Sequence, residues 1–260
     1  MLRRLCIAIT FLTRIPLPFK FESNIQDIGR ASLFFPLIGA GLGLVATGLV
    51  MLSDFLSDFL SGFNVMSKAL LISTLIVALW AILTGALHLD GLADMVDGFG
   101  GGRTREDVLR IMRDHQIGAF GAVALILLMT VKIASVASLI VNASNYGYLI
   151  LAPTLGRWTS VPLGKFMPYA RRDNIGLGIS VTYHTGWFEV VGATLITGVI
   201  FFLSGAGGTG AICWLVVVVA TIRDAYKCSH RIGGITGDTL GANIEICETL
   251  VLVTAAFIAR

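Results

Sequence analysis

Charged residues are scarce in this chain: Asp, Glu, Lys and Arg make up 13% of its 260 residues, whereas 55% are hydrophobic. Soluble domains carry about 25% charged residues, so this composition indicates an integral membrane protein. The formal net charge of +3 is too small to indicate binding to nucleic acid. We therefore expect the lipid bilayer to be a partner of this chain and nucleic acid not to be one.

Motifs of several common enzyme classes are also missing. The four cysteines form no CxxC pair, which argues against a zinc site or a disulfide framework. The sequence contains no Gly-x-Ser-x-Gly motif, no histidine pair at zinc spacing, no haem motif and no Walker pattern. Hydrolase and redox functions therefore have no support in the sequence.

Apolar runs of the length that a membrane helix needs, about 17–25 residues, recur along the chain. We predict an all-α, polytopic integral membrane helical bundle, a single domain over residues 1–260, with about seven (six to seven) transmembrane helices and short cytoplasmic helices. Gly39 and Gly43 stand at GxxxG spacing in the first span, which permits close contact with another helix. The predicted spans are residues 32–52, 69–87, 117–141, 146–163, 187–203, 211–222 (with a start near 207 allowed) and 238–258, with a polar loop at 223–237.

The positive charges lie on one side of these spans. Fifteen of the 19 Lys and Arg residues precede the first span or follow spans two, four and six, while the opposite loops hold only Lys68. Cytoplasmic loops carry such an excess of positive charge. We therefore expect an orientation in the bacterial cytoplasmic (inner) membrane that turns the positive face, and the active site, toward the cytoplasm.

The densest group of polar residues directly follows the second apolar run and reads HLDGLADMVDG at residues 88–98. On a helix Asp90, Asp94 and Asp97 stand at i, i+4 and i+7 and share one face. Aligned carboxylates repel one another unless a cation binds them, and a partial set of hard oxygen ligands suits Mg²⁺. We expect these three residues to bind Mg²⁺. The alternative is a solvated helix end with ion pairs to Arg103 or Arg105.

A second acidic stretch reads TGDTLGANIEICE at residues 236–248. On a helix Asp238, Glu245 and Glu248 share a face, and carboxylates inside an apolar helix are costly enough to be functional candidates. Asp238 lies at the predicted membrane edge, where it is a candidate metal ligand or general base. For Glu248 the alternative is an ion pair with Lys132 or Arg157, the two cations inside predicted spans.

Arginines near these acids complete a candidate phosphate site. Arg113 can bind a phosphate through two parallel hydrogen bonds, and Asp114 can orient it or reach a metal. Singly, most of the surrounding cations are typical topology determinants, but together they make a field that attracts a polyphosphate. The residues alone thus favour Mg²⁺-dependent displacement at a phosphate, catalysed by Asp90, Asp94, Asp97 and Asp238. The candidate substrate- or phosphate-binding residues are His88, Arg103, Arg113, Asp114, Asn243 and Glu245.

Together the motifs resemble the cobalamin synthase family, the adenosylcobinamide-GDP ribazoletransferases. The resemblance runs from about residue 5 to the C-terminus. His115 stands where that family is expected to carry a small polar residue such as Ser. The stretches that carry the resemblance are FLTRIPLP at 11–18, FPLIG at 35–39, HLDGLADMVDG at 88–98, IMRDHQIG at 111–118 and TGDTLGA at 236–242.

The resemblance implies the last assembly step of the cobalamin nucleotide loop. A hydroxyl of α-ribazole, or of α-ribazole 5′-phosphate, would attack adenosylcobinamide-GDP and release GMP, with Mg²⁺ required. Asp90, Asp94 and Asp97 would bind Mg²⁺, Asp238 would be a further ligand or the base, and Arg113 would bind the diphosphate. Partner proteins implied are a second copy of the chain or other cobalamin-assembly enzymes.

Two other functions stay open at this stage. The CDP-alcohol phosphotransferases use similar chemistry, but Asp94 stands where their motif has Arg. An ion transporter would carry acidic residues along a path through the spans, whereas here the aligned acids gather at one face.

Overall fold

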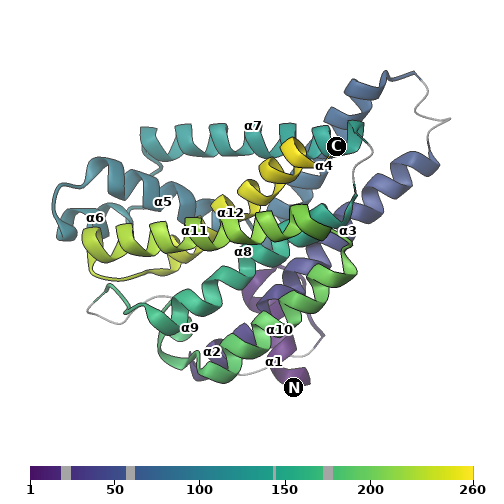
Figure 1. The fold of residues 1–260 in the computed structure, drawn as a ribbon. Helices are drawn as coiled ribbons and strands as arrows, with labels where there is room; N and C mark the ends of the chain where they lie inside the picture. Colours follow the sequence, from purple (N-terminus) through teal and green to yellow (C-terminus); the bar gives the residue numbers. More distant parts are fainter. Residues whose placement is uncertain (19–24, 57–61, 143–144, 172–177, 260) are drawn as a thin grey trace.

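The computed structural model describes residues 1–18, 25–56, 62–142, 145–171 and 178–259 (Figure 1). No β-strand occurs in these ranges, where one isolated bridge pairs Tyr169 with Ile235, so the predicted all-α class is confirmed. The helices are α1 (Leu2–Leu12), α2 (Ile25–Ala31), the 3-10 helix η1 (Ser32–Phe34), α3 (Phe35–Phe55), α4 (Val65–Thr84), α5 (Leu87–Gly101), α6 (Arg105–Ile111), α7 (Ala119–Val141), α8 (Gly147–Phe166), α9 (Gly178–His184), α10 (Trp187–Leu203), α11 (Gly207–Ile232) and α12 (Gly237–Ile258).

Each of the seven predicted spans corresponds to a long helix, but the count of membrane-crossing helices is lower. In the described part of the chain, five helical segments are long and apolar enough to cross a membrane, or six if α9 and α10, bent by 106°, form one span. α8 is not among them, because Arg157 and two prolines interrupt its apolar sequence. Neighbouring helices bury most of its side chains. Six lies at the low end of the expected range, and the chain is an integral membrane protein.

Two predicted boundaries were wrong. The predicted polar loop at 223–237 is mostly helical, because Asp224, Cys228 and Ile232 continue a buried stripe at four-residue spacing to the end of α11. The second span ends at Thr84 and not at residue 87, since Gly85 and Ala86 both adopt left-handed backbone conformations that end α4 and start α5. The motif is nevertheless helical, so the predicted spacing of its aspartates is retained.

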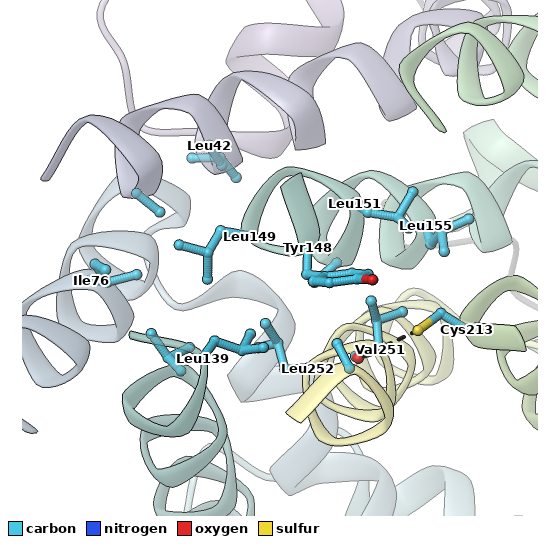
Figure 2. Packing of buried hydrophobic residues seen from close by; sticks show 14 of the residues in the cluster. Leu42, Ile76, Leu139, Tyr148, Leu149, Leu151, Leu155, Cys213, Val251 and Leu252 are labelled. Carbon is cyan, nitrogen blue, oxygen red and sulfur yellow. Dashed lines mark hydrogen bonds between the residues drawn. The ribbon is translucent and has the colours of Figure 1, made fainter. Parts of the chain in front are cut away.

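α8 lies inside the bundle and supplies the centre of the hydrophobic core (Figure 2). Its Leu149, Leu151 and Leu155 are fully buried among side chains from five surrounding helices. Burial of such side chains stabilises each by about 1.5–3 kcal/mol, so α8 is the main anchor of the fold. The neighbours that Figure 2 labels are Leu42 of α3, Ile76 of α4, Leu139 of α7, Cys213 of α11, and Val251 and Leu252 of α12.

The GxxxG prediction for the first span is confirmed. A β-carbon on Gly39 would lie 2.2 Å from the Pro153 carbonyl oxygen, and one on Gly43 would lie 2.3 Å from the Ile150 α-carbon. Glycine at both positions lets the backbones of α3 and α8 touch, the mode of packing that small residues permit between membrane helices.

Four charged side chains form a closed network among α7, α8 and α12. The Lys132 ammonium bonds to Glu245 and to Glu248 (2.9 Å), and Arg157 donates to Glu248 at 2.9 Å. All four side chains are buried. The ion-pair alternative foreseen for Glu248 is thus confirmed, and Glu245 takes part in the same network. Two positive and two negative charges cancel, which makes their burial tolerable.

Candidate functional site

α5 and α12 cross in antiparallel directions at a point where each helix carries glycine. A β-carbon on Gly91 would lie 2.7 Å from the Asp238 carbonyl oxygen, and one on Gly241 would lie 3.2 Å from the His88 α-carbon. This close approach brings the two acidic motifs, about 150 residues apart in sequence, onto the same surface. The predicted clustering of Asp90 and Asp94 with Asp238 follows from it.

Asp94 lies at the middle of this carboxylate cluster. Partial burial is the largest cause that raises the pKa of Asp94 to about 7, and the charges of Asp90, Asp238 and Asp97 contribute to the same rise in that order. Arg171 opposes the shift. A carboxyl group that resists ionisation beside other carboxylates indicates a site of concentrated negative potential, which a bound cation would relieve.

Asp238 is held in place from two sides. Arg171 donates to its Oδ2 atom at 2.7 Å, and the Thr236 hydroxyl donates to the same oxygen at 3.2 Å. Thr236 also caps α12 by accepting from the Thr239 amide. The cap and the ion pair together fix Asp238 at the first turn of the helix, facing α5. Arg113 is close enough for its charge to act on Asp238 as well.

Asp97, the third aspartate of the motif, is engaged differently. Its carboxylate accepts from the Gly118 amide at 2.7 Å and from the Gly121 amide at 2.8 Å, so it caps the start of α7. Only 8% of the residue is exposed. Within the described residues no three His, Cys, Asp or Glu side chains lie close enough to hold a metal together. Of the three aspartates of the α5 motif, Asp90 and Asp94 therefore have no such capping role.

The remaining predicted residues separate into two groups. Arg103, Arg113 and Asp114 are exposed and flank the two ends of α6, and Asp114 lines a cavity together with Asp90 and Asp94. Asn243 instead points into the bundle, where its amide donates to the Thr159 hydroxyl at 2.7 Å. Glu245 lies in the buried ion network described above. The structure therefore does not bring Asn243 and Glu245 to the carboxylate cluster.

Two arginines tie together the connections that surround the cluster. Arg105 donates to the carbonyl oxygens of Ile232 and Ala170, and Arg231 donates to those of Phe99 and Gly102, each at 2.9 Å. These bonds join the chain segments that follow α4, α8 and α11. The segments predicted to share one positive face do therefore meet at one end of the bundle.

An inner cavity of about 240 Å³ opens on one side of α5. His88, which is 3% exposed, lines it together with Asp90, Asp238 and Arg171. Burial, with the neighbouring Arg157 and Lys132 charges, lowers the pKa of His88 to about 3, so its imidazole is neutral. Most of the remaining wall is apolar or small: Phe11, Leu12, Phe35, Leu87, Ser160, Tyr169, Gly178, Val181, Gly237, Leu240, Gly241 and Ile244.

An outer cavity of about 470 Å³ opens on the other side of α5. Asp90 and Asp94 line it, so Asp90 borders both cavities. Its other walls come from the α4–α5 junction, from the connection between α6 and α7, and from α7 itself. These residues are Ala86, Leu89, Ala93, Asp114, His115, Gln116, Ile117, Leu125 and Met129.

Some residues of this site were not singled out from the sequence. Arg171 appeared there only as one of several surrounding cations, because nothing local shows that its segment pairs with Ile235 beside Asp238. Phe11 and Phe35, whose rings stack 5.6 Å apart at the inner cavity, lie in two of the stretches that carried the resemblance. Their position in those two stretches is the feature of the sequence that would have identified them as site residues.

Comparison with known proteins covers nearly the whole chain. The family model of CobS, cobalamin-5-phosphate synthase, matches residues 4–256. The chain belongs to this family. The matched range of the cobalamin-5-phosphate synthase model includes the carboxylate cluster, both cavities and the buried ion network. The alternative families kept open from the sequence, CDP-alcohol phosphotransferases and ion transporters, are replaced by this membership.

Relatives in the cobalamin-5-phosphate synthase family are similar over their full length. A protein of Pseudomonas paraeruginosa is 37% identical over 259 residues, 98% of each chain. One of Pseudomonas savastanoi is 35% identical over 97% of this chain and 98% of its own, and one of Syntrophobacter fumaroxidans is 37% identical over 96% of each. All three are named adenosylcobinamide-GDP ribazoletransferase. No solved structure matches the chain.

Proposed function

We propose that this chain joins α-ribazole, or α-ribazole 5′-phosphate, to adenosylcobinamide-GDP and releases GMP. Its product is then adenosylcobalamin or adenosylcobalamin 5′-phosphate. Membership of the cobalamin-5-phosphate synthase family and the names of the full-length relatives support the substrates. The observation that carries the chemistry is the carboxylate cluster of Asp90, Asp94 and Asp238, which lies between two cavities at one end of the bundle.

The proposed reaction is a displacement at one phosphorus atom. The ribazole hydroxyl oxygen forms a bond to the phosphorus that carries the cobinamide, and the bond from that phosphorus to the bridging oxygen breaks. GMP leaves with that oxygen, and the hydroxyl proton passes to a carboxylate or to solvent. Asp238 is the proposed proton acceptor or a further metal ligand, because Arg171 holds it at the mouth of the inner cavity, at the junction with α5.

Mg²⁺ is the proposed cofactor. The donor set suits it, since Mg²⁺ in nucleotide sites is usually held by one or two carboxylates and completes its shell with water and substrate phosphates. Asp90 and Asp94 would hold it, and the raised pKa of Asp94 indicates a site where a cation is favoured. When bound, the ion would neutralise the diphosphate and stabilise the leaving group. Asp97 supports this arrangement by fixing α5 to α7.

The proposed location is the bacterial cytoplasmic membrane, with the carboxylate cluster toward the cytoplasm. The excess of Lys and Arg at the end of the bundle that carries the cluster supports this orientation. Nucleotide substrates made in the cytoplasm would reach the cluster from that side. Association with a second copy or with other cobalamin-assembly enzymes stays a prediction.

The test is GMP release by purified, detergent-solubilised protein supplied with adenosylcobinamide-GDP, α-ribazole and Mg²⁺. We expect release that requires both the ribazole and the metal and that disappears in Asp94→Asn. A matched control is Asp54→Asn, at an exposed aspartate of α3 paired with Lys68, which should keep full activity. Absence of ribazole-dependent release from well-folded wild-type protein would overturn the proposal.

A further inference from the structure

α5 separates the two cavities, and different residues of α5 line each of them. Leu87 and His88 face the inner cavity, whereas Leu89, Ala93 and Asp94 face the outer one. Asp90 is the residue of α5 that borders both. A transfer between two substrates needs each of them to reach the same reacting phosphorus from a different direction. Two cavities that meet at one carboxylate provide such an arrangement.

The inner cavity suits a compact ligand with an aromatic ring. Its volume of about 240 Å³ lies just below the range of about 300–1,000 Å³ typical of small-molecule pockets, so it cannot hold a corrinoid. Phe11, Phe35 and Tyr169 supply aromatic walls, and aromatic rings favour stacked or edge-to-face contact. A nucleoside with a bicyclic base matches this size and surface.

Two polar groups of the inner cavity lack partners. Among the described residues, the Nδ1 atom of His88 and the Nε atom of Arg171 are buried without a hydrogen bond. An unpaired buried polar group costs about 1–3 kcal/mol, so such groups mark places where a ligand supplies the missing bond. An imidazole nitrogen and a guanidinium N–H can both pair with a sugar hydroxyl or a base nitrogen.

The outer cavity suits a larger ligand that extends beyond the protein, and because Asp90, Asp94 and Asp114 make its lining acidic, a diphosphate there would need the metal. It is about twice the volume of the inner cavity, and the exposed side chains of Asp114, His115 and Gln116 form its rim. Asp94 lies within it, so a metal held there would face a diphosphate in this cavity. A corrinoid attached to that diphosphate would lie outside, beside the apolar side chains of Ile117 and Leu125.

We infer that the inner cavity is the binding site for the ribazole acceptor and the outer cavity the site for the nucleotide diphosphate donor, with the two substrates meeting at Asp90. This inference rests on the proposed function, because it takes both substrates from it. It assigns specificity for the acceptor base to residues of α1, α3, α8 and α12.

Variants that fill one cavity test the assignment. Ser160 of α8 lines the inner cavity, and its hydroxyl bonds only to the Arg157 carbonyl of its own helix, so Ser160→Leu adds volume without breaking a contact between helices. Ile244→Phe adds volume to the same cavity from α12. We expect each to raise the KM for α-ribazole by roughly tenfold or more and to leave the KM for adenosylcobinamide-GDP within about twofold. Leu125→Trp, in the outer cavity, should instead raise the KM for adenosylcobinamide-GDP and leave the KM for α-ribazole nearly unchanged.

Product inhibition of the wild-type protein gives a second test that needs no variant. GMP should compete with adenosylcobinamide-GDP and should inhibit non-competitively against α-ribazole, because the two ligands occupy different cavities. Competition of GMP with α-ribazole would overturn the inference, as would inner-cavity variants that raise both KM values or only that for the donor. Absence of turnover by the wild-type protein would instead count against the proposed function. Failure of the cavity assignment and failure of the proposed function are therefore distinguishable.

Discussion

The Asp97 carboxylate accepts a hydrogen bond of 2.8 Å from the backbone amide of Gly121, which joins the acidic motif of α5 to the first turn of α7. A β-carbon on Gly121 would lie 2.4 Å from the same carboxylate, so glycine is required for the contact. Asp97 therefore positions the wall of the outer cavity, although the spacing of the motif alone made it look equivalent to Asp90 and Asp94.

Replacement of Asp97 should affect stability first. Asp97→Ala leaves the Gly118 and Gly121 amides without their acceptor, at a cost of about 1–3 kcal/mol for each buried group left unpaired. We expect a clear fall in the thermal unfolding midpoint in detergent, together with partial loss of transferase activity. The unfolding midpoint of Asp97→Asn should lie between those of the wild type and Asp97→Ala, because the Asn amide oxygen still accepts one hydrogen bond. Unchanged stability with complete loss of activity would instead favour direct metal binding by Asp97.

Asp94 should behave in the opposite way. Asp94→Asn removes a carboxyl group whose pKa is raised by burial and by its acidic neighbours, so its removal relieves repulsion and should not lower the unfolding midpoint. We expect kcat to fall by about 10²–10³-fold, the loss typical when one preorganised group that stabilises charge in the transition state is removed. Steady-state GMP release and thermal unfolding of the same preparation would measure both effects. A large fall in the midpoint would contradict this role.

Gly91 should not tolerate a side chain. In Gly91→Ala the new methyl group would lie 2.7 Å from the Asp238 carbonyl oxygen, so α5 and α12 would have to separate, at a cost of about 1–3 kcal/mol for overpacking. We expect reduced stability and a loss of activity, since the separation moves Asp90 away from Asp238. Gly41→Ala is the matched control, because nothing lies within 4 Å of its β-carbon position on α3. Equal effects of the two changes would contradict the packing argument.

Much of this arrangement was accessible from the sequence, and the exceptions have physical causes. Apolar runs, GxxxG spacing and the helical register of the aspartates depend on local periodicity, so the helices and a close helix contact at Gly39 and Gly43 were predicted, although the partner helix was not. The capping bonds of Asp97 and the ion pair of Arg171 depend on which helix ends meet, and spacing within one segment carries no such information. Likewise Glu245 was expected to bind substrate, but Asp238 lies next to α5 whereas Glu245 and Glu248 meet Lys132 in the interior.

The buried ion network should depend on charge balance rather than on any single pair. Lys132→Met leaves Glu245 without its cation in the interior, and removal of one partner of a buried pair costs about 3–5 kcal/mol. Adding Glu245→Gln restores neutrality, because Arg157 still pairs with Glu248 at 2.9 Å. We expect the double variant to unfold at a higher temperature than Lys132→Met alone. A double variant no more stable than Lys132→Met alone would contradict this account.

Mg²⁺ should stabilise the wild-type protein through Asp90 and Asp94 even when no substrate is present. A ligand that binds only the folded state raises stability by about 2.7 kcal/mol at 100 times its dissociation constant. We therefore expect the unfolding midpoint to rise with Mg²⁺ after treatment with a chelator, and to rise much less in Asp94→Asn. Asp107→Asn is the control, because Asp107 lies in the exposed capping box of α6 with Thr104. If Mg²⁺ shifted the Asp94→Asn midpoint as far as that of the wild type, the metal would bind elsewhere.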